Sequence, residues 1–493
     1  MDSEMFITTP PTRLFFRCAL PEVVTAVFGA LYSVVDGLFV GRFLGEDALA
    51  AVNLIMPVIL IIEAISNMIA TGASVQMSVL LGKGNREKAS RVFSFSIKFI
   101  LAFSLVLSVL GFVFARQFIT VIAPGATENA ISFGTEYLKV YALFGPLVPV
   151  YFAVDNYLRV CGKQRLSMYI GIASQGLNVL LDFILIAVLH QGIKAAALAS
   201  CLSIALGSVV MLALFTGKRM DVYYTRKNIS SVRFFRILAN GSSELFSNIA
   251  ASVMSIVMNL FLLKYGGTTA VAAFSILMYV DSIIGMVCSG ICDSLQPAVS
   301  YCYGAGLIDR MKSIFRRVLA ASVITSVLAF LFMLLAGRHV AMIFIKPGDT
   351  TLAEMSVNAI KLFSFSYLVG WIDMCFSSYF TALERPGRSL TVSFFGTLFF
   401  PIACLYLLTP TLGLNGVWLM PTVSAIASGS LTVILALNMI RHFAEKCVNL
   451  EHGIPVEATI RRDCGRIEAS DQRGLSQGEG RPRGGQRPRG PER

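Results

Sequence analysis

The chain has 493 residues, of which 55% are hydrophobic and only 14% are charged, and its mean hydropathy is +0.71. A soluble globular domain is excluded, because a chain of this composition cannot cover its own surface with polar groups and most of that surface must face lipid. The net charge of +12 does not indicate a nucleic acid as partner. The basic residues gather in short loops and in the C-terminal tail, where topology and anionic lipid account for them.

Long apolar runs predict an all-α polytopic membrane protein with about twelve transmembrane helices, since a backbone that crosses hydrocarbon must satisfy its own hydrogen bonds. The run 20–41 is too long for a cleaved signal peptide and is taken as the first helix. The remaining runs lie near 48–81, 92–115, 130–158, 167–189, 193–215, 237–264, 270–302, 313–336, 355–383, 390–409 and 413–440.

The loops between these helices divide by charge. Of 27 basic residues counted in them, 19 follow even-numbered helices. The positive-inside rule therefore predicts that both termini are cytoplasmic, in a protein of the cell's inner or plasma membrane. Residues 445–493 contain too few apolar side chains to form a core, so they are predicted to be a disordered cytoplasmic tail.

The sequence repeats itself at an offset of 222 residues. Without a gap, 13 of the 49 residues in 45–93 are identical to those in 267–315, including the pairs Gly82/Gly304 and Gly84/Gly306. Because six predicted helices fall within the offset, both halves insert in the same orientation. Such parallel repeats are one plan of secondary transporters, in which a cavity between the halves opens alternately to each side. The chain thus divides into six-helix lobes at 1–215 and 237–444, joined by a basic cytoplasmic linker at 216–236.

Several segments carry a family resemblance in their order and spacing. The first half contains VDGLFVGRFLGEDALAAV at 35–52, LLGKGN at 80–85, GLNVLLDFILI at 176–186 and GIKAAALAS at 192–200, and the second half contains GICDSLQPAVSYCYGAG at 290–306. Over roughly residues 10–440 the chain resembles the multidrug and toxic compound extrusion (MATE) family. The resemblance implies a V-shaped pair of lobes and the export of cationic and amphipathic compounds by antiport with H⁺ or Na⁺.

Ionisable side chains within the spans are functional candidates, because each costs about 3 kcal/mol or more unless it faces a cavity or a partner. Asn178 and Asp182 are four residues apart and project from one helix face. The resemblance implies that they form a cation-coupling site with Asp36 and Ser200. Oxygen ligands of this kind suit Na⁺, and a buried carboxyl group suits a proton, so both coupling ions stay open. Phe183 stands where the family often has proline, and Ser200 where threonine is common.

Further candidates lie outside this set. Glu244 and Asp373 are candidates for attracting cationic substrates, because some members of the family place acids on the matching helices, and a purely structural role is the alternative. Glu63 lies in the middle of the second span and is included as a third substrate-binding candidate. Pro21, near the start of the first helix, is a candidate hinge because proline interrupts the helical hydrogen bonds, and a proline that caps the helix start is the alternative.

Three other interpretations remain. The four candidate residues of the coupling site also suit a packing cluster, and the architecture also suits a lipid-linked saccharide flippase, although the charges in mid-span here are acidic. An enzyme is not expected, because no span contains HExxH or GxSxG. We expect a monomer without a cofactor and without a metal site beyond Na⁺ at Asp36, Asn178 and Asp182.

Overall fold

The computed structural model describes residues 2–44, 46–122, 127–217, 220–227, 229–345 and 349–451. Every regular element in this part of the chain is a helix. Helix α17 continues to Glu451, and the rest of the predicted disordered tail lies outside the described residues.

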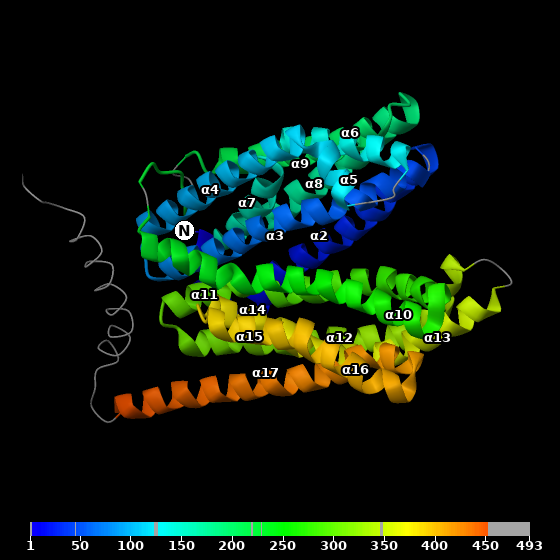
Figure 1. Ribbon diagram of the computed structural model, residues 1–493. Coiled ribbons are helices and arrows are strands. Elements are labelled where there is room, and N and C mark those ends of the chain that lie inside the picture. The colour runs from blue at the N-terminus through cyan, green and yellow to red at the C-terminus, as the bar shows by residue number, and fades with distance from the viewer. Residues whose placement is uncertain are drawn as a thin grey trace, which may run out of the picture.

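The first half forms one lobe, which Figure 1 shows in blue to green. After a short 3₁₀ turn η1 (Asp2–Glu4), its helices are α1 (Met5–Thr8), α2 (Pro11–Phe39), α3 (Glu46–Gly82), α4 (Arg86–Val113), α5 (Ala115–Ile122), α6 (Glu128–Phe144), α7 (Val148–Val160), α8 (Gln164–Asp182) and α9 (Ile193–Leu214). Two π-helical segments extend α2 and α8, namely η2 (Val40–Leu44) and η3 (Phe183–Val188).

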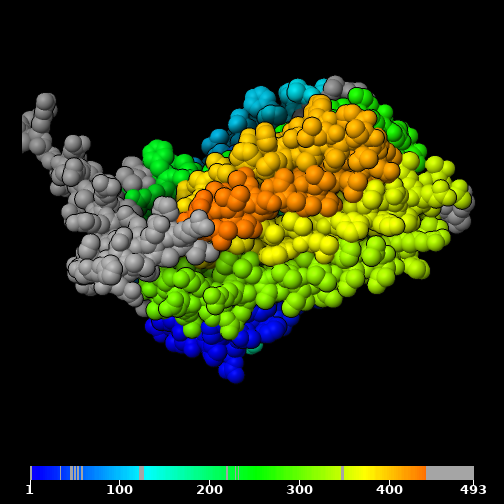
Figure 2. Space-filling view, turned by 90° about the horizontal axis from the view of Figure 1, so that it is seen from below, coloured from blue at the N-terminus to red at the C-terminus, as the bar shows by residue number. Residues whose placement is uncertain are grey.

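The second half forms the other lobe, drawn in green to orange in Figure 1. Its helices are α10 (Ser231–Asp293), α11 (Gln296–Gly304), α12 (Ile308–Phe344), α13 (Thr350–Ser364), α14 (Tyr367–Ala382), α15 (Pro386–Phe394), α16 (Phe400–Leu412) and α17 (Leu414–Glu451), with a π-helical segment η4 (Phe395–Phe399) between α15 and α16. Figure 2 shows helices of this lobe covering one face of the molecule, with the blue start of the chain at its edge.

Local sequence explains several of the helix starts. Pro11 occupies the first turn of α2, where its missing N–H costs nothing. The side chains of Asn85, Thr127 and Asp349 accept hydrogen bonds from the first turns of α4, α6 and α13. Because α2 begins at Pro11, the predicted hinge residue Pro21 lies well inside the helix, which continues through it.

The described helices agree with the predicted number of spans. Nine segments are long and apolar enough to cross a membrane, and two bent pairs, α6 with α7 and α13 with α14, raise the number to 11. One of the nine, Arg233–Gly304, is long enough for two spans. Large apolar side chains on the outside, such as Leu335, Ile343 and Leu407 at 73–78% exposure, fit a lipid-facing surface.

The long segment reverses direction at Gly267. Its backbone has φ +65° and ψ −161° there, outside the helical region and suited to glycine. A straight helix of these 72 residues would measure about 108 Å, far beyond a hydrocarbon core of about 30 Å. Both ends of the segment return to α3, where Ile237 and Tyr301 pack against Gly72 and Gly82. The segment therefore contributes two antiparallel spans, which gives the twelve helices expected.

The lobes meet through glycines at the end of the molecule that carries the N terminus. A Cβ atom on Gly82 of α3 would lie 2.1 Å from the Tyr301 carbonyl oxygen, and one on Gly304 of α11 would lie 2.2 Å from the Val79 carbonyl oxygen. Only glycine permits helices to approach so closely. These two glycines are a matched pair of the 222-residue repeat, so the internal symmetry brings them face to face.

The N-terminal segment and the linker also join the lobes at this end (Figure 1). The Ser3 backbone N–H donates to the Asp221 carboxylate of the linker at 2.8 Å. Arg310 of α12 donates to the Phe6 carbonyl oxygen at 2.7 Å, and the fully buried Phe6 ring packs against Tyr301. Residues 3–9 thus contact both the linker and the second lobe.

The linker is held on the first lobe by charge. The Lys227 ammonium group lies 2.7 Å from the Glu87 carboxylate on α4, which also binds Arg91. Hydrogen bonds from these two cations lower the pKa of Glu87 to about 2. Glu87 therefore stays ionised at any physiological pH and keeps the basic linker attached.

Candidate functional site

Two buried acids meet where α2 and α8 give way to π-helical segments. The carboxyl groups of Asp36 and Asp182 lie within hydrogen-bonding reach of each other, and the Asp182 side chain is fully buried. The segments η2 and η3 pack together just beyond them. Widened turns of this kind are frequent at functional sites. Here they form although Phe183, and not proline, follows Asp182.

No donor among the described residues bonds to Asp36 Oδ1 or to either carboxylate oxygen of Asp182. Two ionised carboxylates in contact repel each other strongly in an apolar setting, so the pair requires a compensating positive charge. One proton shared between the carboxyl groups, or one small cation bound by their oxygens, supplies that charge. The geometry suits either ion.

The other two predicted residues lie next to this acid pair. The Asn178 amide donates to the Ser200 hydroxyl at 3.0 Å and thereby joins α8 to α9. The Asn178 carbonyl oxygen is buried and accepts no hydrogen bond from the described residues. Asn178 lies one turn before Asp182 on the same face of α8. The structure thus gathers all four predicted residues of the coupling site in the first lobe.

Sequence reasoning missed two polar neighbours of this site. Tyr32, one turn before Asp36 on α2, has its hydroxyl close to Ser200. Gln175, one turn before Asn178 on α8, lies beside Gly29 of α2, and its carbonyl oxygen is buried without a donor. Their spacing of three or four residues from the predicted acids and amide was the available signal. Together these side chains form a polar strip between α2 and α8.

The acids proposed for substrate binding are more widely spread. Glu63 on α3 lies near Tyr141 in the first lobe. Glu244 on α10 accepts a hydrogen bond from Asn248 at 3.4 Å. Asp373 on α14 accepts hydrogen bonds from Ser428 and from Thr432 of α17. Within the described part of the chain no hydrogen bond or ion pair joins Glu244 to Asp373, so the structure does not bring these two together in one pair.

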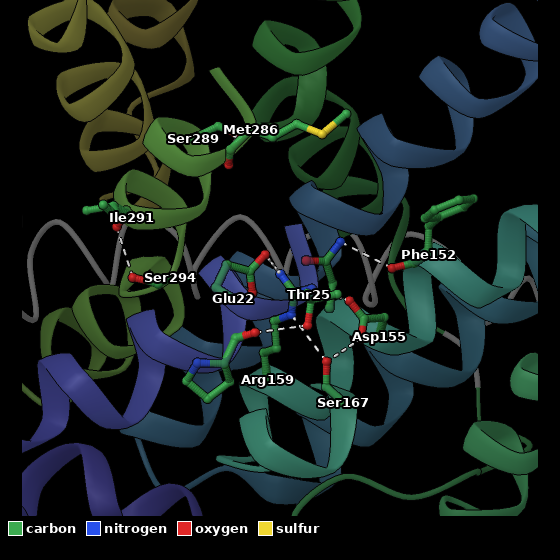
Figure 3. Close-up of polar contacts among 12 residues, drawn as sticks. Glu22, Thr25, Phe152, Asp155, Arg159, Ser167, Met286, Ser289, Ile291 and Ser294 are labelled. Carbon is green, nitrogen blue, oxygen red and sulfur yellow. Dashed lines mark hydrogen bonds and ion pairs between the residues drawn. The ribbon is translucent and has the colours of Figure 1, made fainter. Parts of the chain in front are cut away.

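A second buried charge cluster lies where the first lobe faces α10 (Figure 3). Arg159 of α7 donates to Glu22 of α2 at 2.5 Å and also binds Asp155, one turn earlier on its own helix. Ser167 of α8 donates to the same Asp155 carboxylate. Each of the three charged side chains is only 17–18% exposed. Arg159 follows the predicted span 130–158 and is one of the 27 basic residues assigned to loops, but this assignment is wrong: it lies in the last turn of α7 as a largely buried ion-pair partner.

Glu22 also touches the other lobe. A Cβ atom on Gly290 of α10 would lie 3.3 Å from Glu22 Cγ, so the glycine leaves room for the acid. In the described residues, three or more His, Cys, Asp or Glu side chains nowhere gather as they would around a bound metal ion. The Sγ atom of Cys292 on α10 lies 3.0 Å from the Sγ atom of Cys375 on α14.

Known proteins resemble the chain along most of its length. The multidrug export protein MepA of Staphylococcus aureus (strain N315) is 27% identical over 426 residues, which cover 84% of this chain and 90% of that protein. MepA of Staphylococcus haemolyticus (strain JCSC1435) is 25% identical over 409 residues, covering 82% and 88%.

Solved structures share the fold. The crystal structure of MATE in complex with MaL6 matches with a TM-score of 0.83 at 22% identity, covering 90% of this chain and 100% of that one. An outward-facing multidrug resistance MATE family transporter of the MOP superfamily matches with a TM-score of 0.82 at 22% identity, covering 90% and 99%. At this level of identity the likeness shows the two-lobed helical fold.

The family assignment comes from the sequence model of the MatE family, which matches residues 21–184 and 244–407. The two matched stretches are equally long and lie at related points of the two halves, as the internal repeat requires. Because they cover more than half of the chain, this protein belongs to the multidrug and toxic compound extrusion (MATE) family.

Proposed function

We propose that the protein is a secondary active multidrug efflux transporter, which exports cationic and amphipathic compounds in exchange for H⁺ or Na⁺. In this proposal its two lobes alternate between openings to the two sides of the cell membrane, with both termini in the cytoplasm. It acts as a monomer, needs no cofactor and catalyses no covalent reaction. Support comes from family membership and from relatives that are named multidrug export proteins.

The observation that carries the proposal is the contact between Asp36 and Asp182. A buried carboxyl pair that receives no hydrogen bond from a donor group has to take up a cation or a proton to remain stable between apolar helices. Asn178 and Ser200 lie beside it and supply further oxygen atoms. This polar arrangement favours ion coupling over simple helix packing, because a packing cluster satisfies its own hydrogen bonds.

Ion binding at this pair is coupled to the lobes through α2. The helix carries Asp36 near one end, and nearer the other end it carries Pro21 and Glu22, which meets Arg159 and Gly290. A change of charge at Asp36 that shifts α2 would therefore reach the contact between the lobes. An ion drives transport only if it binds one of the two arrangements more tightly than the other. In this scheme Pro21 is the hinge, and Glu63, Glu244 and Asp373 attract the cationic substrate.

The test is dye efflux from everted vesicles with the Asp36→Asn variant, under an imposed H⁺ gradient or an imposed Na⁺ gradient. Asparagine keeps the size and hydrogen-bonding capacity of the side chain but removes the charge. We expect efflux under the effective gradient to fall to background while the protein remains folded and inserted. The matched control is Asp309→Asn, an identical change at an exposed acid of α12. Near-normal efflux by Asp36→Asn would refute the coupling role.

A further inference from the structure

A pocket of about 290 Å³ lies between the start of α2 and the turn that joins α7 to α8. Three cationic side chains line it: Arg17 from α2, Lys163 from the turn and Arg165 from the first turn of α8. No acidic side chain is among its lining residues. The next acid after Arg17 on α2 is Glu22, and its carboxylate is paired with Arg159. Arg17 and Arg165 therefore give the pocket a positive charge.

The backbone adds to this charge. Gln164, Arg165 and Leu166 form the first turn of α8, and all three line the pocket. The first N–H groups of a helix have no acceptor within the helix and carry the positive end of its dipole. No side chain caps them here. Together with the cations around them, these N–H groups form a site suited to a phosphate group.

The surroundings of the pocket change from cationic to apolar along both helices. On α2, Arg17 is followed one turn later by Leu20, which is 60% exposed. On α8, Arg165 is followed one turn later by Tyr169, which is 62% exposed and also lines the pocket. Both helices begin at the end of the molecule that carries the N terminus, so their later residues lie deeper in the membrane. A ligand that fits has an anionic head and an apolar body.

The second half of the chain keeps only part of this arrangement. At the 222-residue offset, Lys163 corresponds to another cation, Arg385, whereas Arg17 corresponds to Ala239, Arg165 to Gly387 and Tyr169 to Thr391. Pro386, which stands at the start of α15 in place of Gln164, has no N–H to offer. The combination of Arg17, Arg165 and Tyr169 is thus present in the first half only and does not follow from the internal repeat.

We propose that this pocket binds the phosphate headgroup of an anionic phospholipid. Basic pockets between transmembrane helices on the cytoplasmic side are suited to such headgroups, and the sidedness proposed above assigns the lipid to the cytoplasmic leaflet. The bound phosphate bridges α2 to the turn before α8, close to the Glu22–Arg159 ion pair, which joins α2 to the end of α7. The lipid therefore stabilises the position of α2, the helix that carries Asp36.

The experiment measures the thermal unfolding of the purified full-length chain in uncharged detergent while phosphatidylglycerol, phosphatidylcholine or inorganic phosphate is added. We expect phosphatidylglycerol to raise the melting temperature, and phosphatidylcholine and inorganic phosphate to leave it unchanged. The double variant Arg17→Ala/Arg165→Ala is expected to need at least about tenfold more phosphatidylglycerol for the same effect. The matched control is Lys312→Ala/Arg316→Ala, which removes two exposed cations from α12 outside the pocket.

Each contrary result overturns the proposal. Equal stabilisation by inorganic phosphate would assign the pocket to the free anion. An equal loss in the control variant would assign the effect to general attraction at the basic surface. No stabilisation of the wild type by phosphatidylglycerol would exclude the site altogether. None of these outcomes depends on transport, so they leave the proposed efflux function to its own test.

Discussion

The glycine contact between the lobes gives a quantitative prediction for Gly82→Ala. The added methyl group would lie 2.1 Å from the Tyr301 carbonyl oxygen, whereas ordinary contact begins at 3.4 Å. The helices α3 and α11 therefore have to move apart by about 1.3 Å, and overpacking of this kind typically costs about 1–3 kcal/mol. A cost of about 2 kcal/mol lowers the population of the closed arrangement about 30-fold relative to an open one.

The assay is the distance between spin labels at positions 88 and 309, which are exposed at the starts of α4 and α12 in the two lobes. We expect Gly82→Ala to shift the distribution to longer distances. Gly304→Ala should act likewise, and the double variant should add less than the sum, because one displacement relieves both collisions. The control Gly285→Ala adds a methyl group where no atom lies within 4 Å. If Gly82→Ala gave the same distribution as Gly285→Ala, the packing argument would be wrong.

Two further predictions concern the same end of the molecule. Arg159→Ala leaves Glu22 and Asp155 buried without their partner and should lower the free energy of unfolding by about 3–5 kcal/mol. Thermal unfolding measures this loss. The control is Thr381→Ala at the repeat-related position, which should lower the free energy of unfolding by about 1 kcal/mol. Equal losses of stability in the two variants would contradict the prediction. Phe6→Ala removes a fully buried ring from its contact with Tyr301, so hydrogen exchange of residues 3–9 should accelerate at least about tenfold. Unchanged exchange, as expected for the exposed control Thr8→Ala, would show that Phe6 does not anchor the segment.

The fold was largely predictable because the bilayer restricts the possibilities. Apolar runs predicted the spans, and the repeat predicted two lobes of equal orientation. The repeat also identified Gly82 and Gly304 as a related pair. It did not show that they touch each other, since this depends on where the symmetry axis passes. The π-helical segments η2 and η3 were not predicted either, because their geometry follows from packing between helices and leaves no sequence pattern.

The candidate site was predictable only in part. The spacing of Asn178 and Asp182 placed them on one helix face, but Asp36 was joined to them through the family resemblance. Arg159 was misplaced because a count of loop charges treats every cation at the end of an apolar run as solvated. Its spacing of four residues from Asp155 was the signal of an ion pair within a helix.

The two halves show which polar groups belong to the fold and which belong to one lobe. Asp155, Arg159 and Ser167 form a charged cluster in the first half. At the 222-residue offset these positions correspond to Ser377, Thr381 and Ser389. These second-half residues also bond to one another, with Ser389 lying 3.0 Å from Ser377 and 2.7 Å from Thr381. The polar contact is therefore common to both lobes, whereas its charge occurs only in the first.

The acid pair differs more sharply between the halves. Asp36 corresponds to Met258 and Asp182 to Cys404, and both of these are buried in one hydrophobic cluster of the second lobe. A helix contact at this place therefore forms without any carboxyl group, so the stability of the lobe does not require the two acids. A buried acid in a transmembrane helix costs free energy. Packing does not explain why the first lobe keeps two such acids where the second lobe has apolar side chains. This asymmetry supports the assignment of ion coupling to Asp36 and Asp182, and it confines the proposed ion to the first lobe.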